Sequence, residues 1–271
     1  MICLIFSISF IIFYILFLAY NFFWRSILII DYLTGDERNV YYSYVVYVLP
    51  AVLFAMWASS HVNSTFRRYS TQYSMRNMTG YDAARRVLDA NGLYSVRIER
   101  VSGSLTDHYD PRNNVIRLSD SVYHQTSTAA IGVAAHEAGH AIQYAQNYAP
   151  IRLRNAIIPV TNLGSKLAMP LILIGLLFAG SGSSMGTLAY VGVACFGLST
   201  LFQLFTLPTE FDASRRAIRA IETCGILTSD EIYGSKKVLT AAALTYVAAL
   251  AVSLMQLFRL LTIVNRRNNH S

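Results

Sequence analysis

Two histidines four residues apart, with a glutamate directly after the first, are the strongest chemical signal in this sequence: His136, Glu137 and His140. In an α-helix, residues i and i+4 lie on one face, so both imidazoles can reach the same divalent metal ion. Zinc accepts imidazole nitrogens, and the neighbouring carboxylate is placed to take a proton from water rather than to bind the ion. The pattern predicts a zinc-dependent hydrolase with two histidine ligands and Glu137 as general base.

A catalytic zinc needs a third protein ligand and one position left for water. Gln143 and Gln146 stand where a metzincin has its glycine and its third histidine, so that class is excluded. The best remaining candidate is Glu210. Pro208 favours the first turn of a helix, which would place Glu210 near a helix N-terminus. A carboxylate that only complements the helix dipole is the alternative interpretation.

The residues before the histidines favour the helix that the metal site requires. Thr126, Ser127 and Thr128 offer N-cap hydroxyls, and Ala129–Ala135 is a run of small or apolar residues. The alternative is a pair of surface histidines that are four residues apart by chance. That alternative also requires Glu137 to follow the first histidine by chance.

The composition indicates a membrane protein. Hydrophobic residues make up 54% of the 271 residues and charged residues only 14%, against about 25% charged in soluble domains. The charges are clustered, and the stretches between them are long enough to cross a bilayer. We expect about five transmembrane helices, at Ile2–Trp24, about Tyr42–Ser60, Leu167–Gly180, Gly186–Leu207 and about Val238–Val264.

These segments divide the chain into five parts. Residues 1–60 hold two transmembrane helices, 61–166 form a water-facing catalytic domain with the histidine helix, and 167–207 form a transmembrane hairpin. Residues 208–237 supply the third ligand, and 238–271 form a last transmembrane helix and a tail. We therefore expect a mainly α membrane protein with a small α+β domain.

The water-facing part carries signals for one helix and two strands. Thr79–Asp82 has a capping-box pattern that opens a helix, and Asn91-Gly92 closes it. Strand patterns follow at Tyr94–Val101 and at Asn114–Leu118, with the turn-rich residues 107–113 between them. The second strand is also a candidate to pair with an extended substrate.

The distribution of basic residues predicts the orientation. Residues 61–166 and 208–237 hold seventeen of the 22 lysines and arginines, so both parts should face the cytoplasm. Arg266 and Arg267 would then lie outside, unless the last apolar segment is re-entrant. The net charge of +7 is spread over two membrane-adjacent parts without a nucleic-acid-binding motif, which argues for lipid headgroups and against nucleic acid as the partner.

Several blocks of sequence, in order, resemble the YugP-type membrane zinc metallopeptidases of bacteria, a family related to the gluzincins. The resemblance covers about residues 43–264 and rests on residues 64–69, 83–88, 105–111, 136–140, 207–217 and 241–248. It implies a gluzincin-like domain in the bacterial plasma membrane, one catalytic Zn²⁺ ion, and a peptide or protein as substrate. It also implies that Glu210 completes the zinc site.

One position departs from the gluzincin pattern. Many gluzincins have an aspartate four residues after the ligand glutamate, where it holds a ligand histidine. This chain has Ser214 there, and Asp212 lies on another face of the expected helix. We expect Ser214 or another group to hold the imidazole.

For the membrane-bound peptidase that the resemblance implies, the residues suggest a mechanism, and we expect an endopeptidase that acts on membrane or membrane-adjacent proteins. Glu137 would take a proton from water that attacks the peptide carbonyl and pass it to the leaving amine. The oxyanion needs a further donor, for which His108, Tyr109, Arg215 and Arg216 are candidates. A solvated loop position is the alternative for His108.

Three other classes of membrane protein fit the sequence less well. An intramembrane protease of the site-two type would need its motif inside a membrane span and a later Asp-Gly ligand, and residues 121–147 are too polar and too short. A non-catalytic scaffold with a structural zinc would usually close the fourth position with protein. A transporter would carry polar residues within its spans.

Overall fold

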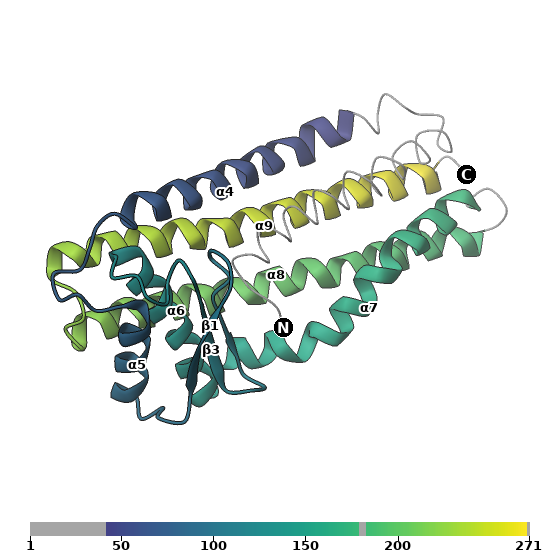
Figure 1. The fold of residues 1–271 in the computed structure, drawn as a ribbon. Helices are drawn as coiled ribbons and strands as arrows, with labels where there is room; N and C mark the ends of the chain where they lie inside the picture. Colours follow the sequence, from purple (N-terminus) through teal and green to yellow (C-terminus); the bar gives the residue numbers. More distant parts are fainter. Residues whose placement is uncertain (1–41, 179–182, 270–271) are drawn as a thin grey trace. The chain divides into compact units, whose positions relative to one another are not determined.

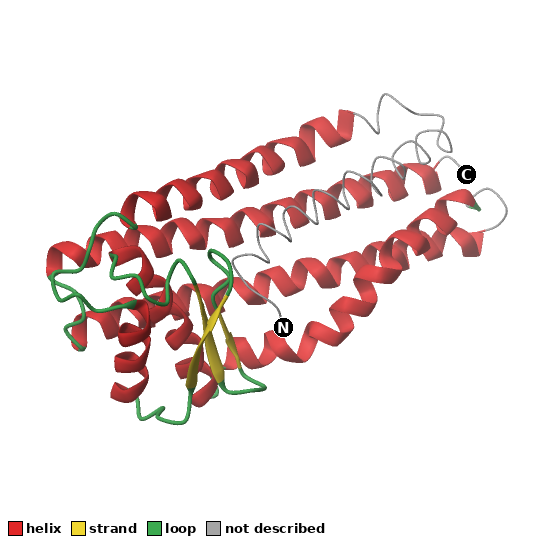
Figure 2. Cartoon of the chain, viewed as in Figure 1, coloured by secondary structure: helices red, strands yellow, loops and turns green. Residues whose placement is uncertain are grey.

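The computed structural model describes residues 42–178 and 183–269, and this part of the chain is mainly helical with one small sheet (Figures 1 and 2). Its elements in order are a π-helical segment Tyr44–Val48, α4 (Leu49–Tyr69), α5 (Gly80–Ala90), β1 (Arg97–Val101), β2 (His108–Asp110), β3 (Val115–Ser119), α6 (Thr128–Ala145), α7 (Ala149–Leu177), α8 (Ser183–Thr223) and α9 (Ser229–Asn269). The first expected span, Ile2–Trp24, lies outside the described residues.

Four helical stretches of the described residues are long and apolar enough to cross a membrane: Tyr44–Tyr69, Ala149–Leu177, Gly186–Thr223 and Ser229–Arg266. Each overlaps one of the four spans expected after the first. Each is longer than expected, because charged or polar residues that suggested loops continue the helices. The helix that contains the third span already begins at Ala149, and it includes Arg152, Arg154 and Lys166.

The expectation that a helix begins at Pro208 is wrong. This proline lies inside α8, which runs without a break from Ser183 to Thr223. Proline removes one backbone donor, but long apolar helices tolerate it where neighbouring groups satisfy the backbone. Glu210 therefore lies inside a continuous helix, and helical turns both before and after it fix its backbone position.

The chain divides into two compact units, and the first contains Trp57–Arg152 and Thr206–Tyr246. Its sheet has the strand order β1-β3-β2, with β1 parallel and β2 antiparallel to β3. The central strand β3 is thus paired on both sides, so the expected substrate pairing along Asn114–Leu118 is wrong. Helix α6 packs against β2 and β3, and α5 packs against α6 and β1 (Figure 1).

Two helices of this unit begin at the caps that the sequence predicts. The Thr79 hydroxyl accepts from the Asp82 amide at 3.1 Å, and the Asp82 carboxylate accepts from the Thr79 amide at 2.9 Å, which completes the capping box of α5. Helix α6 is capped by Ser127, whose hydroxyl accepts from the Ala130 amide at 3.2 Å.

Helix α6 lies in the core of the first unit. Every residue from Thr128 to Gln143 is buried, and its small side chains let neighbouring elements approach closely. A Cβ added to Gly139 would lie 2.7 Å from the carbonyl oxygen of Ala213 in α8. This close approach of two backbones brings the middle of α6 to the part of α8 that carries Glu210.

The second unit comprises, among the described residues, 42–56, 153–178, 183–205 and 247–269. Its core is formed by aliphatic side chains of α7, α8 and α9, among them Ile172, Val193 and Leu260. The buried guanidinium of Arg259 lies over the ring of Tyr44, 5.5 Å from its centre.

Candidate metal centre

Three side chains from two helices of the first unit meet at one point. His136 and His140 lie on one face of α6, with their ring centres 4.7 Å apart. Glu210 of α8 faces both, and its Oε2 is 3.3 Å from the Nε2 of His136 and 3.4 Å from the Nε2 of His140. All three are buried, and one potential ligand atom from each lies within 4.8 Å of the others.

This donor set fits a zinc ion. Tetrahedral zinc with bonds of about 2.0–2.1 Å holds neighbouring ligand atoms about 3.3–3.4 Å apart. The two distances from Glu210 to the imidazoles match that spacing. Two imidazoles and one carboxylate are also a donor combination of catalytic zinc sites, in which the fourth position takes water or substrate.

Gln143 fixes the orientation and the tautomer of His140. Its amide nitrogen donates to the carbonyl oxygen of Thr209 at 2.8 Å and to the carboxylate of Asp212 at 2.9 Å. Its amide oxygen, which can only accept, lies 3.0 Å from the Nδ1 of His140. The imidazole must therefore carry its proton on Nδ1, and the lone pair of Nε2 is directed to Glu210.

Ser214 holds the other imidazole. Its hydroxyl oxygen lies 3.1 Å from the Nδ1 of His136, four residues after Glu210 on the same helix. The structure thus places Ser214 beside His136, one of the two candidate ligand histidines. Each imidazole has its Nδ1 engaged by a neighbour and its Nε2 directed to the third ligand candidate, an arrangement typical of metal-binding histidines.

Glu137 is buried next to this group and is held by the sheet. Its Oε2 accepts a hydrogen bond from the backbone amide of Tyr109 in β2 at 2.9 Å. Burial raises the pKa of Glu137 to about 7, although the neighbouring imidazole of His136 lowers it. Strand β2 therefore positions the candidate base with a backbone group, which no side-chain pattern could reveal.

The structure assigns different surroundings to the other candidate residues. The phenol of Tyr109 donates to Asn114 at 3.0 Å, so its backbone rather than its hydroxyl reaches Glu137. His108 has its Nδ1 2.9 Å from the carbonyl oxygen of Thr106, to which it donates. Arg215 is exposed on α8.

Arg216 supports the hydrogen bonds that orient His140. Its guanidinium donates to Asp212 and to the side chain of Gln146, and it lies over the ring of Tyr148. Asp212 in turn accepts from Gln143. A chain of hydrogen bonds thus leads from Arg216 through Asp212 and Gln143 to His140. Sequence analysis missed the role of Gln143, although its place one turn after His140 was a usable signal.

Comparisons with known proteins identify the family of this chain. A family model described as "Putative neutral zinc metallopeptidase" matches residues 44–265. The "Putative membrane protease YugP" of Bacillus subtilis (strain 168) is 44% identical over 220 residues, which cover 81% of this chain and 96% of the relative. No solved structure matches the chain.

Proposed function

Because the chain belongs to the family described as "Putative neutral zinc metallopeptidase", we propose that it is a membrane-bound endopeptidase that uses one zinc ion to hydrolyse membrane or membrane-adjacent proteins. The observation that carries this proposal is the buried group of His136, His140 and Glu210, with ligand spacing that suits zinc and with Glu137 beside it. The first unit would be a gluzincin-like peptidase domain.

In this proposal His136, His140 and Glu210 hold the ion. Zinc, when bound, supplies Lewis-acid chemistry that makes water more acidic and a peptide carbonyl more electrophilic. Glu137 takes a proton from the attacking water and later gives it to the leaving amine. A buried carboxylate beside the ion and its water is placed for both transfers. The Tyr109 amide keeps Glu137 in place during them.

Two features support this function over the alternatives. Helix α6 is not among the four candidate spans of the described residues, whereas a site-two-type protease carries its histidine motif inside a membrane span. The metal-ligand group found in the described part of the chain has three members, whereas a structural zinc usually has four protein ligands. An open position is what a hydrolase requires.

Glu137→Gln tests the proposal. The variant should bind zinc as the wild type does but lose about 10²- to 10⁴-fold in turnover of unfolded or membrane-protein substrates, because an amide cannot accept the proton. Metal analysis and substrate cleavage by the purified protein in detergent measure both. Glu222→Gln is the control, since Glu222 is exposed on α8, and it should be fully active. Equal activity of Glu137→Gln and wild type would remove the general-base assignment.

A further inference from the structure

Four exposed basic side chains lie where two candidate membrane spans of the first unit end: Arg67 and Arg68 on α4, and Lys236 and Lys237 on α9. Arg67 is the first Lys, Arg, Asp or Glu of α4, so it closes the uncharged part of that helix. Lys237 opens an uncharged run of α9 that continues to Phe258. These four residues are called the α4–α9 basic patch.

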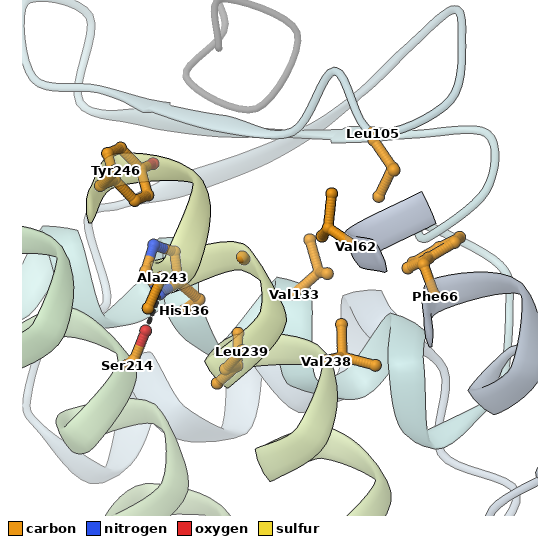
Figure 3. Close-up of a pocket in the computed structure, with 11 residues that line it drawn as sticks. Val62, Phe66, Leu105, Val133, His136, Ser214, Val238, Leu239, Ala243 and Tyr246 are labelled. Atoms are coloured by element: carbon orange, nitrogen blue, oxygen red, sulfur yellow. Dashed lines mark hydrogen bonds between the residues drawn. The ribbon is translucent and has the colours of Figure 1, made fainter. Parts of the chain in front are cut away.

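The two halves of the patch belong to helix ends that pack together. Phe66 of α4 lines the same small pocket as Val238 of α9 (Figure 3), and each directly adjoins a patch residue in the sequence. One turn further out, a Cβ added to Gly234 of α9 would lie 2.9 Å from the ring of Tyr69. The four charges therefore gather around one contact between two helices.

The described residues supply no counter-charge to this patch. None of its four side chains forms an ion pair with a carboxylate of the part of the chain that the structure describes. Glu231, near the start of α9, is bonded elsewhere, because its carboxylate accepts from the backbone amides of Met75 and Thr228 at 2.6 Å and 2.8 Å. Like charges at one helix contact repel each other, so a bound anion would stabilise this part of the molecule.

Aromatic side chains are typical of the level at which lipid headgroups meet the hydrocarbon core, and they surround this patch. The guanidinium of Arg68 lies over the ring of Tyr69, 5.7 Å from its centre, and the ammonium of Lys237 lies over Tyr233 at 5.1 Å. Trp57 is 52% exposed and lies about 15 Å before the patch along α4. That is about half of the 30 Å hydrocarbon core, so a lipid with its phosphate at the patch has its chains beside Trp57.

We propose that the α4–α9 basic patch binds the headgroup of an anionic phospholipid such as phosphatidylglycerol, whose chains lie along α4. This inference goes beyond the proposed function and depends on neither zinc nor peptide hydrolysis. An anionic headgroup neutralises the clustered charges, whereas phosphatidylcholine has no net charge and gains less. The bound lipid ties together two helix ends that also hold the start of α6, where Thr128 is bonded to both Tyr69 and Ser235.

Quenching of Trp57 fluorescence by brominated lipids tests this proposal. Trp24→Phe leaves Trp57 as the only tryptophan of the chain, and this full-length parent is placed in vesicles of phosphatidylcholine and phosphatidylglycerol, with one of the two brominated in its chains. Phosphatidylglycerol should bind around Trp57 about 3- to 10-fold more strongly than phosphatidylcholine. Replacement of all four patch residues by glutamine should make the two lipids equal.

A matched control removes the same number of positive charges at exposed positions of the first unit that lie outside the candidate spans. It carries four substitutions: Arg86→Gln, Arg97→Gln, Arg100→Gln and Arg112→Gln. This variant should keep the preference of the parent for phosphatidylglycerol. An equal loss of preference in the control and in the patch variant would show that only net charge matters, and it would overturn the site.

Two further results would overturn the proposal: no preference in the parent, and an unchanged preference in the patch variant. Inorganic phosphate that abolishes the preference, where chloride at the same ionic strength does not, would assign the patch to soluble phosphate instead of lipid. If the patch variant fails to fold, the two glutamine pairs on α4 and on α9 are measured separately. Each pair should lower the preference, and an unchanged preference in both overturns the site. Since none of these measurements uses peptide cleavage, failure of the proposed function is distinguishable from failure of this inference.

Discussion

The two imidazoles of the candidate centre are held by chemically different partners, and this difference has consequences for zinc affinity. His136 faces a hydroxyl that can donate or accept, whereas His140 faces the oxygen of Gln143, which can only accept. The side-chain amide of Gln143 cannot flip to exchange its oxygen and nitrogen, because the nitrogen already donates to Thr209 and Asp212. Gln143 therefore determines which nitrogen of His140 is available for a metal ion.

Gln143→Leu should weaken zinc binding by about 10- to 100-fold, because the orientation of His140 loses its support. Competition with a chelator of known affinity measures this on the full-length protein in detergent. Gln143→Glu keeps an acceptor for His140 but places a carboxylate beside Asp212, so it tests the donor role separately and should also bind zinc less tightly. Gln125→Leu, at an exposed position, is the control. Unchanged affinity in Gln143→Leu would contradict the positioning role.

Asp107 is a buried carboxylate whose charge opposes folding. Burial raises its pKa to about 6, although the amide and hydroxyl of Ser119 donate to it and lower the pKa. In the unfolded chain the pKa returns to 3.8. The folded state therefore binds the proton more tightly, and stability falls as the pH rises from about 4 to about 6.

Asp107→Asn should raise the melting temperature at pH 8 more than at pH 5. The amide oxygen can still accept from the Ser119 backbone, its nitrogen can donate to the Ser119 hydroxyl, whose own proton can go to Ser121, and the change removes a cost of up to about 3 kcal/mol. Asp110→Asn is the opposite control: the Asn113 and Arg117 side chains hold the pKa of Asp110 well below its usual range, so neutralising it should destabilise at neutral pH. The melting temperatures of the variants and the wild type are measured by thermal unfolding at both pH values. A change in melting temperature for Asp107→Asn that is the same at both pH values would contradict a raised pKa of Asp107.

At the residue scale, the sequence predicted the residues whose spacing follows from helix geometry. His136 and His140 share a face because of the four-residue repeat, and Ser214 reaches His136 from one turn after Glu210. Proximity between Glu210 and the histidines depends on how two helices pack, which spacing does not encode. The backbone contact from Tyr109 to Glu137 was not predictable either.

At the scale of secondary structure, the contact between α6 and α8 positions the whole centre. Gly139 lies against Ala213, which is flanked by Asp212 and Ser214 and lies three residues after Glu210. Any residue with a Cβ at position 139 must push α8 away, since the nearest atom is backbone and cannot rotate aside. Because Gly139 has no side chain, α6 and α8 can approach closely enough to bring Glu210 to the two histidines.

Gly139→Ala should lower both the melting temperature and the zinc affinity, with an overpacking cost of about 1–3 kcal/mol. Chelator competition and thermal unfolding measure the two effects. Gly197→Ala is the matched control on α8, because a Cβ there meets nothing within 4 Å; it should be neutral or slightly stabilising. Similar effects of the two substitutions would show that the close approach does not control the site.

Helix ends with capping side chains were predictable, whereas the short strand β2 was not. Thr79 and Ser127 start their helices with the expected hydrogen bonds. Strand β2 has only three residues, too few to show an alternating pattern, and its sequence contains turn-forming residues. The ends of α7 and α8 were not predictable, because the charges before Lys166 indicated a water-facing part and Pro208 indicated the first turn of a helix. Long helices accommodate basic residues near their ends and a proline inside them.

At the scale of the whole molecule, composition predicted the membrane class and four of the expected helices, since hydrocarbon thickness sets a minimum length for an apolar helix. Orientation depends on the sign of the charges between spans. Helix α7 has 29 residues and extends about 44 Å, longer than the hydrocarbon core of about 30 Å. Its two ends should therefore lie on opposite sides of the membrane.

We predict that the candidate metal centre faces the cytoplasm, because seventeen of the 22 basic residues lie in residues 61–166 and 208–237. Single cysteines test this after replacement of Cys3, Cys195 and Cys224. Ser104→Cys, exposed between β1 and β2, should react with a membrane-impermeant maleimide only after permeabilisation. Ser184→Cys, between the spans of α7 and α8, should react in intact cells, because one membrane crossing separates it from Ala149. Labelling of Ser104→Cys in intact cells would place the centre outside and reverse the orientation.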